Sequence, residues 1–273
     1  MKLTSIKSIV TKSPVANRIR EKRLIRKIEN HLTTEKNSPM SQIPKELTIP
    51  FAKMYVRRGQ KSFWKTSYNE LVKYFGLQGA APKKIQKKNL PGFTSASYSN
   101  VYNSLAVSKK YVEISDEKKI NSIAHELKHC KQAAEVITTK GFGLDKYVDA
   151  VCEHMAIEDA QLRDILVKND KRSSNFIENK TAEYKHNVAP YIRKSFKNIE
   201  KLPKIEPLNS DNSKVEMYID GLKNYKDPEV VTDSLADYRQ NILEQEAFET
   251  GDKLENYYKK FEDCCDDFFT CSE

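Results

Sequence analysis

The chain has 273 residues, of which 38% are hydrophobic and 31% charged, and its formal net charge is +9. This composition is typical of a folded globular protein with a sizeable core and excludes an intrinsically disordered chain. No stretch approaches the roughly 20 apolar residues of a membrane-spanning helix, and the first residues lack the apolar run of a secretory signal. We therefore expect no transmembrane segment, and either a cytoplasmic location or export without a cleavable signal peptide.

The positive charge is concentrated near the N-terminus. Residues 1–61 contain fifteen Lys or Arg against four Glu, a net charge of +11, which leaves −2 for the rest of the chain. Residues 16–32 place Ile and Leu at helical spacing among these cations, and residues 37–50 contain three prolines. We predict a basic helical arm with a proline-containing linker over residues 1–50. Such an arm either docks on the body of the protein or binds an anionic partner, a nucleic acid or a membrane surface.

The chain between residues 63 and 115 predicts a helix followed by a small sheet. Residues 63–75 form one apolar face at helical spacing and are followed by Gly76, a common helix terminator. Residues 81–92 are basic and contain two prolines, so we expect an exposed loop there. Residues 99–115 are rich in Val and Tyr and partly alternate, which predicts one or two strands. The remaining segments favour helix, so the expected fold class is α+β and predominantly helical.

A helix predicted over residues 115–137 carries the most informative motif of the chain. Ser115 and the two acidic residues after it provide an N-terminal cap and favourable negative charge. One apolar stripe is formed by Ile120, Ile123, Leu127, Cys130 and Ala134. His125 and His129 fall on nearly the opposite side of this helix, and Glu126 lies between the two sides.

This His-Glu-x-x-His spacing is suited to a catalytic zinc ion. Histidines one helical turn apart have Cβ atoms about 5 to 6 Å from each other and can bind one metal ion together. Glu126, directly after His125, can reach a water molecule bound by that ion. Zinc lowers the pKa of such a water towards ~7, and a neighbouring carboxylate can take its proton as general base. The motif therefore predicts Zn²⁺ bound by His125 and His129.

The segments "YNSLAVSKKYVEI" and "SIAHELKHCKQ" together resemble the zincin metallopeptidases. In that family an edge strand lies beside the His-Glu-x-x-His helix and holds the substrate backbone. The resemblance covers roughly residues 95–138 and a second piece near the C-terminus. Gln132 and Glu135 stand where the metzincin subgroup requires Gly and a third His, which excludes that subgroup. The resemblance implies a zincin-like domain over residues 51–273, with a small sheet beside the motif helix and a helical insertion at about 139–235.

A zincin needs a third protein ligand, and the gluzincin subgroup supplies a glutamate from a later helix. Residues 237–258 resemble that pattern and contain Glu244 and Glu246, which lie on either side of the apolar stripe of that helix. We prefer Glu244, which has Ala three residues later, and keep Glu246 as an alternative. Glu158 is a further alternative because it follows His129 by 29 residues on a buried helical face. His154 is a weaker candidate at the border of the same face.

Two accessory roles are also expected. Gln132, close to one turn beyond His129, is placed to orient that histidine through a hydrogen bond. A tetrahedral intermediate also requires stabilisation of its negative charge, and Tyr238, Tyr257 and Tyr258 are candidates, with none preferred.

The sequence as a whole predicts a zinc-dependent metallopeptidase of gluzincin type. It would hydrolyse peptide bonds in a peptide or protein substrate through a zinc-activated water, with Glu126 as general base. One alternative is a DNA-associated zinc protease that uses the basic arm. A second alternative is a non-catalytic interaction protein in which the motif helix is vestigial.

Overall fold

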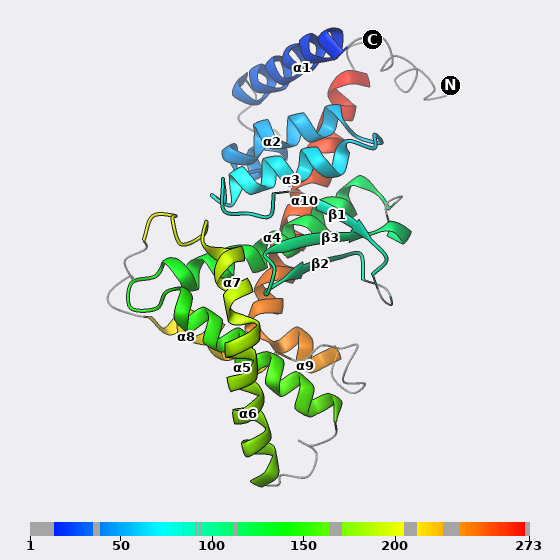
Figure 1. The fold of residues 1–273 in the computed structure, drawn as a ribbon. Helices are drawn as coiled ribbons and strands as arrows, with labels where there is room; N and C mark the ends of the chain where they lie inside the picture. The colour runs from blue at the N-terminus through cyan, green and yellow to red at the C-terminus, as the bar shows by residue number, and fades with distance from the viewer. Residues whose placement is uncertain are drawn as a thin grey trace.

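The computed structural model describes residues 14–34, 39–83, 85–90, 92, 94–111, 114–163, 171–204, 212–225 and 235–270. It is mostly helical with a small three-stranded sheet, as the sequence predicted (Figure 1). The helices are α1 (Pro14–Thr34), α2 (Lys45–Val56), α3 (Phe63–Tyr74), α4 (Asp116–Thr138), α5 (Leu144–Leu162), α6 (Lys171–Asn187), α7 (Ala189–Phe196), α8 (Ser213–Lys223), α9 (Leu235–Gln240) and α10 (Ile242–Thr270). None of these helices is long and apolar enough to cross a membrane.

Helix α4 lies at the centre of the fold. It packs against α3, α5, α8 and α10, and against the sheet through strand β2 (Figure 1). The apolar stripe predicted for it is confirmed: Ile120, Ile123, Leu127, Cys130 and Ala134 are all buried. Ser115 occupies the N-cap position, but its side chain makes no capping hydrogen bond, so only the two acidic residues of the first turn favour this helix end.

The sheet has the strand order β1-β3-β2, with β3 in the middle. The strands are β1 (Ile85–Lys88), β2 (Ala96–Ser99) and β3 (Ser104–Ser108). β1 pairs with β3 in parallel and β2 pairs with β3 antiparallel, with Tyr98 opposite Leu105. The prediction of strands in residues 99–115 is confirmed for β3, whereas β2 begins earlier. The loop predicted for residues 81–92 is wrong for residues 85–88, which form β1. An edge strand of mostly polar residues carries little hydrophobic signal in the sequence.

The N-terminal helix is docked on the protein, which is one of the two possibilities that the sequence left open. Ile28 of α1 is only 1% exposed, and Glu21 of α1 forms a 2.9 Å ion pair with Arg57 just after α2. The expected linker instead contains a short 3₁₀ helix, η1 (Pro39–Gln42), and the first half of α2. Leu47 and Phe51 of α2 are fully buried, so helical apolar spacing outweighs the proline signal in this segment.

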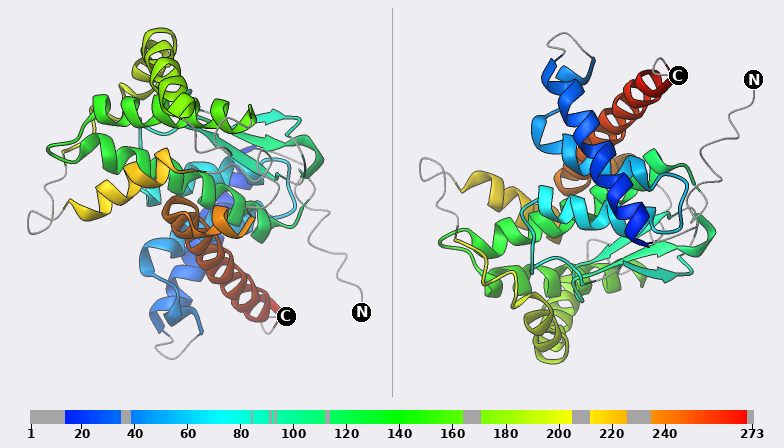
Figure 2. Two further views of the ribbon diagram at one scale, coloured as in Figure 1. Left: turned by 90° about the horizontal axis from the view of Figure 1, so that it is seen from below. Right: turned by 90° about the horizontal axis from the view of Figure 1, so that it is seen from above.

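Helix α10 packs along α4 and forms the other main wall of the core. Its predicted apolar stripe is confirmed, since Leu243, Ala247, Leu254, Tyr258 and Phe261 are buried. A Cβ atom at Gly251 would lie 2.8 Å from Oδ1 and 3.1 Å from the backbone oxygen of Asn121 on α4. The absence of a side chain there lets the two helices approach closely. The C-terminal half of α10 lies with α1 and α2 at one end of the molecule, and α6 lies at the other (Figure 2).

Asn241 separates α9 from α10 and caps the longer helix. Its Oδ1 accepts a 2.9 Å hydrogen bond from the backbone N–H of Leu243, and its backbone oxygen accepts one of 2.8 Å from Gln245. Its Nδ2 donates a 2.7 Å hydrogen bond to the backbone oxygen of Gly221 on α8. One side chain therefore starts α10 and ties its first turn to α8.

The two roles of Asn241 can be separated by substitution. We expect Asn241→Ala to lower the free energy of unfolding by about 1 to 2 kcal/mol, because it removes both the cap and the tie to α8. Asn241→Asp keeps the capping oxygen and loses only the donor, so it should cost less. Urea unfolding followed by circular dichroism measures both. Equal stability of the Ala variant and the unchanged protein would contradict this account of the helix start.

Candidate metal centre

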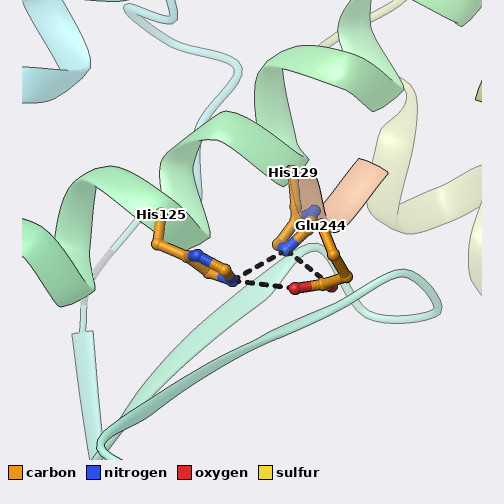
Figure 3. A group of neighbouring side chains, drawn as sticks. All are labelled: His125, His129 and Glu244. Carbon is orange, nitrogen blue, oxygen red and sulfur yellow. Dashed lines mark hydrogen bonds and ion pairs between the residues drawn. The ribbon is translucent and has the colours of Figure 1, made fainter. Parts of the chain in front are cut away.

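Three side chains from two distant segments converge in the interior. His125 and His129 project from α4, and Glu244 projects from the first turn of α10 (Figure 3). The two histidine Nε2 atoms are 3.2 Å apart. Glu244 Oε1 lies 3.1 Å from His129 Nε2, and Glu244 Oε2 lies 3.2 Å from His125 Nε2. These three residues form a group that can hold a metal ion.

The spacing and chemistry of these atoms fit a metal ion. In a tetrahedral site with bonds of 2.0 to 2.1 Å, ligand atoms are about 3.3 Å apart, close to the three separations found here. Glu244 is 1% exposed, and among the described residues its Oε2 has no polar partner besides Nε2 of His125 at 3.2 Å. A buried carboxylate oxygen without a donor is costly unless a cation meets it. The donor set therefore favours a bound cation between the two helices.

The charges of these three side chains also favour a bound cation. Burial by itself raises the pKa of Glu244, but the imidazoles of His129 and His125 outweigh it and hold the pKa well below its usual range. Burial lowers the pKa of the His129 imidazole, whereas the charge of Glu244 and its hydrogen bond raise it overall to about 9. Each partner thus stabilises the charged form of the other. The carboxylate creates a strong preference for positive charge at the imidazoles, which a proton or a metal ion can satisfy.

Gln132 orients His129 in the way the sequence predicted. Its Oε1 lies 3.0 Å from Nδ1 of His129, while its Nε2 donates a 2.9 Å hydrogen bond to the backbone oxygen of Leu243. Because the amide nitrogen is used at Leu243, the oxygen must accept from Nδ1–H of the imidazole. When a metal ion takes the place of the proton, the other ring nitrogen, Nε2, directs its electron pair towards Glu244 and His125, as metal ligation requires.

Two tyrosines hold the carboxylate of Glu244. Tyr225, just after α8, donates a 2.9 Å hydrogen bond to Glu244 Oε1. Tyr238, on α9, is hydrogen-bonded to both Glu244 and Tyr225, and burial raises its pKa above its usual value. Tyr238 was one of three tyrosines considered from the sequence, whereas Tyr225 carried no pattern that distinguished it. Tyr258 lies in the core against Phe51, so the structure does not bring it to the centre.

Glu246 lies away from the histidines. It forms a 2.8 Å ion pair with Lys128 and a 3.4 Å ion pair with Lys214, and it accepts a short hydrogen bond from Tyr218. Burial raises its pKa, but the hydrogen bonds from Lys128 and Tyr218 outweigh burial and lower the pKa to about 2. With these partners Glu246 connects α4, α8 and α10 and is not part of the three-residue group.

Glu158 and His154 also lie elsewhere. Both belong to α5, where His154 Nε2 is 3.3 Å from Glu158 Oε1. His154 packs edge-on against the ring of Tyr225, with 5.5 Å between the ring centres. The structure therefore places this pair behind the tyrosine that holds Glu244, and not among the converging donor atoms.

Glu126 lies at the junction of α4 and the sheet. Its carboxylate is buried and accepts a hydrogen bond from the backbone N–H of Tyr98 on β2. Burial raises the pKa of Glu126, and the neighbouring His125 and His129 only partly oppose this shift. The carboxylate is thus a stronger proton acceptor than a solvent-exposed glutamate, and it lies on the wall of the same cavity as the metal-binding group.

A cavity of about 240 Å³ opens beside these side chains. Strand β2 forms one wall, and the group of His125, His129 and Glu244 forms part of another. Apart from His125, Glu126, His129 and Glu244, the lining is uncharged, and it includes the apolar residues Ala133 and Val136 of α4, Leu222 of α8 and Leu243 of α10, together with Tyr147 of α5. Segment 139–235, predicted as a helical insertion, therefore provides α5 and α8 as walls of the cavity.

Comparisons of the chain with protein-family models, with curated proteins and with solved structures find no significant match.

The three carboxylates considered as third ligand give a direct test of the centre. We expect Glu244→Gln to weaken binding of a Zn²⁺ probe by at least about 100-fold, because an anionic donor is replaced by a neutral one. Glu246→Gln and Glu158→Gln are matched controls that keep the residue size and should change the affinity less than about tenfold. Competition with a chromophoric chelator measures all three. If Glu246→Gln weakened binding as much as Glu244→Gln, the assignment of Glu244 would be wrong.

Proposed function

We propose that the protein is a zinc-dependent metallopeptidase of the zincin type, with a gluzincin-like ligand set. The convergence of His125, His129 and Glu244 at mutual distances near 3.2 Å is the observation that carries this proposal. Because Glu126 lines the same cavity, the site combines a metal-binding group and a buried base within reach of one ligand.

The donor set supports zinc as the ion. Two imidazole nitrogens and one carboxylate oxygen are the protein ligands of many catalytic zinc sites, which keep a further position open. When bound, zinc would act as a Lewis acid that makes water acidic and polarises a carbonyl group. Tyr225 and Tyr238 hold the Glu244 carboxylate, and Gln132 fixes His129, so these residues orient the ligands.

Glu126 is the group we assign as general base. Its buried position gives it a raised pKa, which increases its ability to take a proton near neutral pH. The hydrogen bond from Tyr98 N–H fixes the carboxylate against β2. The same carboxyl group can then return the proton to the leaving amine, as peptide hydrolysis requires.

Strand β2 is suited to hold the substrate. It is an edge strand of the sheet, its inner edge pairs with β3, and it lines the cavity. An extended peptide can add to such an edge through backbone hydrogen bonds, with alternate side chains entering pockets. Ala133, Val136 and Leu222 line the same cavity. We expect them to form an apolar recess that receives a side chain next to the cleaved bond.

The role of Glu126 is tested by replacing its carboxylate with the amide of Gln. Glu126→Gln should retain zinc close to one equivalent, since it is not part of the ligand group, and should lose peptide hydrolysis by at least about 1,000-fold. His125→Ala, in contrast, should lose the metal as well as the activity. Elemental analysis measures the zinc content, and mass spectrometry of a peptide mixture after incubation measures the hydrolysis. Full zinc content with no hydrolysis by the unchanged protein would favour the non-catalytic interaction protein instead.

The apolar recess predicts substrate preference. Peptides with Leu or Phe beside the cleaved bond should have a kcat/KM about 10- to 200-fold above that of peptides with Asp or Lys there, because the three residues of the recess carry no charge or hydrogen-bonding side chain. Leu222→Ala enlarges the recess and should shift preference towards larger side chains. Met217→Ala, at an exposed position of the same helix, is the control. Equal rates for all four peptides would refute the recess as a specificity site.

A further inference from the structure

Two described contacts fix helix α1 on the protein, and both lie on the same side of the helix. Ile28 is buried, and Glu21 pairs with Arg57 next to α2. These contacts use the apolar side of the helix and one of its acidic residues. The rotation of α1 about its axis is therefore set, and so is the face that it presents to solvent.

The outward face of α1 carries a concentrated positive charge. It is formed by the exposed residues Arg18, Lys22, Arg23, Arg26 and Lys27. None of these five forms an ion pair with an acidic residue in the part of the chain that the structure describes. Residues four apart on a helix rise by about 6 Å, so the cations form two rows on one side of α1. We call these five residues the basic face.

Within the residues that the structure describes, no acidic residue of α10 forms an ion pair with the basic face. Glu262 and Asp266 of α10 lie 3.4 and 2.7 Å from Arg58, which follows α2. These two acidic side chains therefore pair with a cation outside α1. In the described part of the chain, the basic face is therefore open to an external anion.

We propose that the basic face binds the phosphate backbone of double-stranded nucleic acid without reading its sequence. Five clustered cations, three of them arginines with a strong preference for phosphate, complement a regular polyanion. Helix α1 has no Phe, Tyr or Trp, so it lacks the platforms on which unpaired bases stack. This inference does not rest on the metal centre.

A membrane is the less favoured partner of the basic face. A helix that lies in a lipid interface inserts a broad apolar side, and the apolar side of α1 is used against the protein. On the outward side Ile19, 49% exposed, is the large apolar residue among the cations. What remains is attraction by charge, which suits an extended polyanion such as duplex DNA.

Salt-dependent binding of the full-length chain to a fluorescent 20-base-pair DNA tests the proposal. Five phosphate contacts give a slope of about −4.5 in a plot of log affinity against log salt, equivalent to about a 500-fold loss between 50 and 200 mM. We expect this slope for the unchanged chain and a slope weaker than about −1.5 after substitution of all five basic-face residues by Gln. The substituted residues are exposed, and circular dichroism verifies that the helix content is kept.

The control variant removes the same charge elsewhere. It carries Gln at the exposed residues Lys109, Lys146, Lys194, Lys197 and Lys201. We expect its slope to stay within about one unit of that of the unchanged chain. If both variants lost binding equally, net charge and not the basic face would be responsible, and the proposal would be overturned.

Two further measurements separate the alternatives. Binding to vesicles of one part phosphatidylserine to three parts phosphatidylcholine, but not to DNA, would replace the nucleic acid by a lipid surface and overturn the proposal. Zinc content and peptide hydrolysis of the basic-face variant should be unchanged. A chain that binds DNA through the basic face but holds no zinc would retain this inference and reject the proposed peptidase.

Discussion

The close packing of α10 against α4 is the constraint on which the rest of the site depends. Gly251 allows the two helices to approach, and Asn241 fixes where α10 begins. Together they place Glu244 in the first turn of α10, facing the two histidines. A shift of one residue in the start of α10 would turn its side chains by about 100°, and the carboxylate would leave the histidines.

A second layer of polar contacts keeps these donors in position. Gln132 links His129 to the backbone of α10, and Tyr225 and Tyr238 hold the free side of Glu244. Buried polar networks of this kind are stable only when nearly every group is satisfied. Here Glu244 Oε2 has no polar partner besides Nε2 of His125 among the described residues, so a cation bound between them would complete the network.

Sequence patterns succeeded where the local signal was strong. The α4 helix and the apolar stripe of α10 follow from apolar residues repeated every three or four positions, and both are buried as expected. Strand β1 was missed because a short edge strand with lysines looks like a polar loop. Helix α2 was missed because Pro50 suggested a linker, although the buried residues around it pack as a helix. In these two cases tertiary packing determined the secondary structure, and the local composition did not predict it.

The amino-acid sequence alone determined that His125 and His129 lie together on one helix with Glu126 next to them, because the relative positions of these side chains depend only on the pitch of that helix. The sequence also limited the third ligand of the predicted metal site to a few candidate residues. Glu244 follows His129 by 115 residues, and helical periodicity placed Glu244 and Glu246 equally far from the apolar stripe. Only the tertiary structure separated them, since the docking of α10 turns Glu244 towards the histidines and Glu246 towards Lys128. The rotation of a helix against a distant neighbour is a property of the packed core, which no local pattern contains.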